Sequence, residues 1–180
     1  IRNVGDFYMD YENTKSVKSY FIAGILFASV LGTLSHFFYQ WSAGNPVIAL
    51  FSPVNESTWE HMKLVFFPVL LWSFFLPAGI RKSNPSLRPA LLAGGLLGTW
   101  SIPVLFYTYS GILGKDVAFI DIAIFFIAVL ISFGTAWKLG RSSGAGEFRL
   151  LIGVLSILMA LAFFLFTFAP PQIGLFAEQL

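Results

Sequence analysis

The side chains able to bind a metal ion or transfer a proton are few in this chain, and two histidines stand out among them. His36 lies near the end of an apolar stretch, and His61 follows Glu56 and Glu60 at the start of another. Two imidazoles and one carboxylate can hold zinc and leave a coordination position for water, which a second carboxylate can deprotonate. This chemistry makes His36, His61 and Asp121 candidate ligands of zinc or another divalent cation, with Glu56 as the alternative carboxylate. Glu56 and Glu60 are the candidate catalytic bases.

The polar residues around His61 also have a structural explanation. Residues 57–60 fit the S-x-x-E capping box of a helix N-terminus, with Asn55 as an alternative cap. Glu56, Glu60 and Lys63 fall on one side of a helix, which predicts an internal ion pair. Neither feature accounts for His61. We therefore keep a wider set of binding candidates, which comprises His36, Asn55, Glu56, Ser57, Glu60, His61, Tyr107, Tyr109 and Asp121.

The composition indicates that these residues belong to a membrane protein. Of the 180 residues, 57% are hydrophobic and 11% are charged, whereas soluble chains carry about 25% charged residues. The mean hydropathy is +0.77. A net charge of +2 is too small for a nucleic-acid-binding protein. The absence of cysteine excludes a disulfide scaffold and a thiolate metal site.

The apolar segments predict an all-α, polytopic bundle with five transmembrane helices. A bilayer core is crossed by about 20 apolar residues. A polar segment, 1–16, precedes the single transmembrane domain, 17–169, and a tail, 170–180, follows it. The five spans are expected at about 18–41, 56–80, 89–110, 117–139 and 149–169.

The basic residues predict the orientation of these spans. With five spans, nine of the 11 lysines and arginines fall on one side, and only Lys63 and Lys115 do not. Positive charge is retained in the cytoplasm, so we expect the N-terminus inside and the C-terminus outside. We expect a multi-pass protein of the bacterial cytoplasmic membrane.

Small residues and polar residues together predict how the helices are arranged. Gly24, Ala28 and Gly32 recur at four-residue spacing in the first span, as do Ala90, Gly94 and Gly98 in the third. Such stripes are typical of close helix packing in lipid. His36 continues the first stripe, so it is expected to face the bundle interior. The histidines, the glutamates, the two tyrosines and Asp121 are all expected in the outer third of the membrane, where they would form one polar layer.

The run F-S-P-V-N-E-S-T-W-E-H-M-K at 51–63, with Ser35–Tyr39 and Trp41 before it, resembles a bacterial family of small uncharacterised polytopic membrane proteins. The likeness extends over about 30–176, and its specific part is P-V-N-E-S-x-W-E-H. The resemblance supports the helical membrane fold. It implies no activity, because the family has none established.

Three functions are compatible with the sequence. The first is a small-molecule or ion site near the outer face, with a role in transport or sensing. The second is a metal-assisted, membrane-embedded hydrolase or transferase, although the chain lacks H-E-x-x-H and G-x-S-x-G. The third is an accessory subunit that meets a lateral membrane partner or another copy of itself. The bilayer and a small molecule or ion are the expected partners. Whether the protein is an enzyme stays open at this point.

Overall fold

The computed structural model describes residues 4–142 and 144–178, and the side chains from Lys15 onward within those ranges. Every regular element in this part of the chain is helical. Part of the predicted segment 1–16, with Arg2, and the last two residues of the predicted tail lie outside the described residues. The elements are α1 (Val4–Trp41), α2 (Pro46–Ala49), α3 (Thr58–Phe74), α4 (Ala78–Ser83), α5 (Leu87–Leu113), α6 (Ala118–Leu139), α7 (Gly144–Glu147), α8 (Arg149–Phe168) and a short 3₁₀ turn, η1 (Gly174–Phe176).

Within the described ranges, four helices are long and apolar enough to cross a bilayer. They are Lys15–Trp41 within α1, and the whole of α5, α6 and α8. The predicted span 56–80 is divided, because α3 has 17 residues and ends at Phe74. Pro77 explains the break, since proline disfavours a helical residue before it and cannot donate the backbone hydrogen bond. At 1.5 Å per residue, α3 is about 26 Å long, slightly less than the hydrocarbon core. The five-span count and the orientation stay predictions.

The two stripes of small residues are packing surfaces, as predicted. A Cβ atom placed on Gly94 would lie 2.2 Å from the carbonyl oxygen of Ser132 on α6, and one on Gly98 would lie 2.5 Å from that of Ala128. On α1, a Cβ atom on Gly32 would lie 2.5 Å from the carbonyl oxygen of Leu64 on α3. Glycine at these positions therefore lets the backbones approach each other closely.

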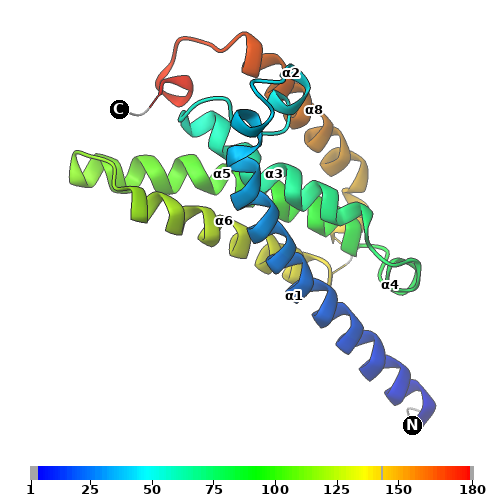
Figure 1. Cartoon of the computed structure of the whole chain (residues 1–180). Coiled ribbons are helices and arrows are strands. Elements are labelled where there is room, and N and C mark those ends of the chain that lie inside the picture. The colour runs from blue at the N-terminus through cyan, green and yellow to red at the C-terminus, as the bar shows by residue number, and fades with distance from the viewer. Residues whose placement is uncertain (1–3, 143, 179–180) are drawn as a thin grey trace.

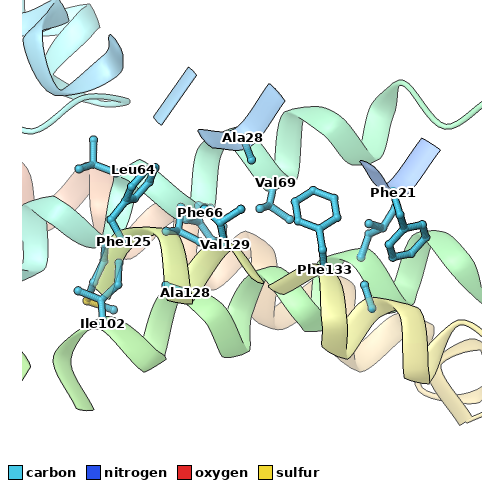
Figure 2. Packing of buried hydrophobic residues seen from close by; sticks show 14 of the residues in the cluster. Phe21, Ala28, Leu64, Phe66, Val69, Ile102, Phe125, Ala128, Val129 and Phe133 are labelled. Atoms are coloured by element: carbon cyan, nitrogen blue, oxygen red, sulfur yellow. The ribbon is translucent and has the colours of Figure 1, made fainter. Parts of the chain in front are cut away.

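A continuous apolar core joins α1, α3, α5 and α6. Figure 2 shows Phe21 and Phe133 at one end of this core, and Leu64, Ile102 and Phe125 at the other. In Figure 1, α5 and α6 run alongside each other while α1 crosses them obliquely. In this view the end of α1 therefore lies apart from the beginning of α6.

The last helix covers the other side of α3 through aromatic contacts. Trp59 of α3 lies 4.8 Å, between ring centroids, from Phe163 of α8 and 4.8 Å from Phe176 of η1. The segment that begins α3 is thus held between α8 and the chain that follows it. This contact fixes the position of the residues next to Trp59, among which His61 is the one of chemical interest.

Candidate metal centre

Three side chains from separate parts of the chain meet at one end of the bundle. His36 comes from the last turns of α1, His61 from the first turn of α3, and Glu56 from the connection that precedes α3. Nε2 of His61 lies 3.3 Å from Oε2 of Glu56, and Nε2 of His36 lies 3.8 Å from Oε1 of the same carboxylate. The two imidazole rings stack with their centroids 5.3 Å apart. We call these three residues the His–Glu–His cluster.

The start of α3 orients the imidazole of His61. Nδ1 of this ring lies 2.9 Å from the carbonyl oxygen of Ser57, one turn earlier. Because a carbonyl oxygen can only accept, Nδ1 carries the proton of this hydrogen bond. In the neutral ring, Nε2 then presents its lone pair to Glu56. Two acceptors face each other there, so either a second proton or a metal ion must lie between them.

Hydrogen bonds within the connection fix the position of Glu56. The side chain of Asn55 accepts a hydrogen bond from the backbone N–H of Ser57 at 3.1 Å, and Ser57 caps α3 by accepting from the N–H of Glu60 at 3.4 Å. The predicted Ser57 cap is confirmed. Glu56 itself is exposed, and the hydrogen bond from His61 holds the pKa of its carboxyl below the usual range. Asn55 and Ser57 therefore shape the site through the backbone.

The dimensions of the cluster suit a small divalent cation. One donor atom from each of the three residues lies within 4.8 Å of the others. Ligands 2.0–2.1 Å from a tetrahedral zinc ion are about 3.3 Å apart, which matches the separation between His61 and Glu56. Small side-chain movements would bring in His36. The hydrogen bond from Nδ1 of His61 to a backbone carbonyl is the usual support of a metal-binding imidazole.

Asp121, which the sequence offers as a metal ligand, is placed nearby and bound differently. Its carboxylate accepts a hydrogen bond from the hydroxyl of Tyr109. The same hydroxyl accepts from the backbone N–H of Val117 at 3.0 Å, which ties the start of α6 to α5. Asp121 still lines the same cavity as the cluster. Glu56 is therefore the carboxylate closest to both histidines, and Asp121 is available for another role.

A cavity of about 610 Å³ opens beside the cluster. Its polar end is formed by the cluster together with Asp116 and Asp121, and no lysine or arginine is found among the described residues that line it. Its remaining wall is apolar apart from Thr33 and Thr58. Asp116 was not among the sequence candidates. Its position just before α6, five residues from Asp121, was the only available signal.

Glu60 and Tyr107, two further candidates, are placed away from the cluster. The Glu60 carboxylate is buried and pairs with Lys63 at 2.6 Å, so the predicted ion pair is confirmed. It also accepts from the backbone N–H of Val54 at 3.0 Å rather than closing the capping box on Ser57. The hydroxyl of Tyr107 donates to the carbonyl oxygen of Gly174 and holds the tail.

Comparison with known proteins places this architecture in a family. The sequence profile of the family of unknown function DUF6512 matches residues 9–180. The chain belongs to this family. No curated protein and no solved structure matches it. Membership in DUF6512 agrees with the expected uncharacterised family, and the chemistry of the site must be argued from the residues themselves.

Proposed function

We propose that this membrane protein binds a divalent transition-metal ion, in the simplest case zinc, through His36, Glu56 and His61. The observation that carries the proposal is the convergence of three donor atoms within 4.8 Å of one another, with Nε2 of His61 3.3 Å from the Glu56 carboxylate. Imidazole nitrogen and carboxylate oxygen are both ordinary zinc ligands. A bound cation would replace the proton that this contact otherwise requires.

Three protein ligands leave an open coordination position, and the cavity gives a small molecule access to it. Structural zinc sites are closed by four protein ligands, whereas sites that bind water or substrate keep one position free. The volume of about 610 Å³ lies in the range of small-molecule sites. The metal and the cavity together therefore form one binding site for a small molecule with an oxygen or nitrogen donor.

Metal-assisted hydrolysis or group transfer is a second candidate function. The observation that favours it is Asp121, a carboxylate that lines the cavity outside the cluster and that Tyr109 holds in place. A metal-bound water needs such a neighbouring base. Transport would require a path past the cavity, and the core residues Ala28, Ala128 and Val129 beneath it are fully buried. We therefore propose binding rather than transport.

Metal analysis of the purified protein tests the proposal. Protein stripped with a chelator, incubated with zinc and desalted should retain a stoichiometric amount, and the double variant His36→Ala/His61→Ala should retain none. Glu56→Gln should weaken retention, since the amide is a poorer ligand. Asp116→Asn is the matched control, because Asp116 lines the same cavity without belonging to the cluster. Zinc that stays below stoichiometry in the wild type, or that survives in the double variant, would overturn the proposal.

A further inference from the structure

The cavity beside the His–Glu–His cluster has an apolar floor deep in the bundle. Leu64 of α3, Ile102 and Phe106 of α5, and Phe125 of α6 line it and are buried. Figure 2 shows three of them, Leu64, Ile102 and Phe125, together at one end of the apolar core. A ligand that fills this space must carry a substantial apolar part.

One side of the same cavity is formed by residues that face outward. Phe37 of α1 is 41% exposed, and Ile122 and Phe126 of α6 are 58% and 42% exposed, yet all three line the cavity. They belong to Lys15–Trp41 and Ala118–Leu139, both candidate membrane spans. The apolar wall between α1 and α6 is therefore in contact with the surroundings of the helices, which in a membrane are lipid chains.

The crossing of α1 and α6 explains this opening. The helices touch where Gly32 meets the ring of Phe125, and a Cβ atom on Gly32 would lie 2.6 Å from that ring. Beyond this contact the end of α1 and the start of α6 diverge (Figure 1). Thr33, one residue after Gly32, lines the cavity at the edge of the gap and is exposed. The cavity thus lies between the divergent ends.

The charges of the polar end restrict what the ligand can carry there. Glu56, Asp116 and Asp121 line it, and among the described lining residues no lysine or arginine balances them. A divalent ion at the cluster would leave the polar end with a net negative charge. A phosphate-bearing headgroup would be repelled by this field, whereas an uncharged carbonyl could still donate an electron pair to a metal ion.

We propose that the cavity takes up a neutral acyl amphiphile from the bilayer, through the gap between α1 and α6. Its ester or amide carbonyl lies at the His–Glu–His cluster, and its acyl chain lies along Leu64, Ile102 and Phe125. This assignment rests on the proposed metal-binding function and names the class of molecule that the site receives. Its basis is the combination of an apolar floor, a wall open towards lipid and an acidic polar end.

Photo-crosslinking in membranes tests this assignment. The probe is a monoacylglycerol with a photoreactive diazirine in its acyl chain, and peptide mapping locates the adducts. Adducts are expected on the buried cavity-lining residues of α3, α5 and α6, along which the acyl chain is placed. Unlabelled monoacylglycerol should compete with the probe, whereas phosphatidic acid should not. Competition by phosphatidic acid as strong as that by monoacylglycerol would overturn the assignment, as would adducts spread evenly over other apolar surfaces such as α8.

A variant that narrows the opening separates specific uptake from general contact with lipid. Thr33→Trp should reduce the adducts on α6 by about tenfold or more, which corresponds to about 1.4 kcal/mol of binding free energy. Val30→Trp is the matched control, since Val30 is 59% exposed on the same helix and does not line the cavity. Equal labelling of the two variants would contradict uptake through this gap.

Zinc content measured on the same samples distinguishes failure of this inference from failure of the metal-binding proposal. Thr33→Trp is expected to retain zinc while it loses the adducts. A wild-type protein that binds zinc without localised adducts would overturn the lipid assignment alone. A wild-type protein without zinc would overturn both.

Discussion

Replacement of Lys63, the buried lysine of α3, tests whether its partner Glu60 has a structural role. Lys63 has no exposed surface, and Nζ donates to the Glu60 carboxylate and to the hydroxyl of Thr167, both at 2.6 Å. Its third hydrogen bond goes to the carbonyl oxygen of Ala49 at 2.9 Å, and the carbonyl oxygen of Ser52 lies 3.4 Å away. One ammonium group therefore joins α3, α8 and the connection that leads to Glu56.

Replacement of this lysine by methionine keeps the apolar stem and removes the charge. The Glu60 carboxylate would then be buried without its cation, which typically costs about 3–5 kcal/mol. For a chain of this size that loss lowers the melting temperature by roughly 6–20 °C. The double variant Lys63→Met/Glu60→Gln should lose less than the sum of the two single variants, by about 1–3 kcal/mol, because it removes both charges together.

Thermal unfolding in detergent at a fixed scan rate measures the effect, since membrane proteins often unfold irreversibly. Lys82→Met is the matched control, because Lys82 is exposed on α4 and its loss should change stability by no more than about 0.5 kcal/mol. Zinc binding by the surviving folded protein should be unchanged. A melting temperature for Lys63→Met equal to that of Lys82→Met would refute the structural role. Loss of zinc from Glu60→Gln without a loss of stability would place Glu60 in the metal site.

Three further predictions concern packing, orientation and the second carboxylate. Gly94→Ala should destabilise the protein by about 1–3 kcal/mol, because its Cβ would lie 2.2 Å from a backbone carbonyl oxygen of α6. Gly111→Ala is the control, since a Cβ there would have nothing within 4 Å, and it should be neutral or stabilising. Equal shifts of the melting temperature in the two variants would contradict the packing of α5 against α6. The chain has no cysteine, so a single introduced cysteine reports on which side of the membrane its residue lies. In intact cells a membrane-impermeant maleimide should label Lys115→Cys but not Ser142→Cys. Labelling of Ser142→Cys and not of Lys115→Cys would contradict the predicted orientation. Tyr109→Phe removes the hydrogen bond to Asp121, so it should lower the free energy of unfolding by about 1–2 kcal/mol and leave zinc binding intact. A loss of zinc binding would instead show that Asp121 is a metal ligand.

The helical architecture could be predicted because lipid imposes strict demands on sequence. Apolar length indicated the helices that became α1, α5, α6 and α8. The four-residue spacing of Gly94 and Gly98 indicated a packing face on α5, but not that α6 is the helix packed against it. The apolar content of 56–80 predicts a single span and does not indicate the break after α3. Pro77, whose ring interrupts the backbone hydrogen bonds, was the signal available for it.

That His36 and His61 lie at the same end of the bundle was easier to predict than the direction of the polar side chains around them. Residue counting put His36 and His61 at a similar level, and the structure brings both to one cavity. The same counting treated Glu56 and Glu60 as neighbours on one helix. Glu56 in fact precedes α3, so the connection sets its direction, while Glu60 turns towards Lys63 on the opposite side. The direction of Glu60 depends on contacts with Thr167 of α8, and such long-range contacts cannot be inferred from the local sequence.

Anomalous diffraction from zinc-soaked crystals tests the metal site most directly. A single strong peak is expected at the zinc edge, about 2.0–2.1 Å from Nε2 of His36, Nε2 of His61 and one carboxylate oxygen of Glu56. The same crystals of His36→Ala/His61→Ala should show no peak there. A wild-type crystal whose cluster carries no anomalous density, or whose zinc lies instead on other side chains, would contradict the proposed metal site.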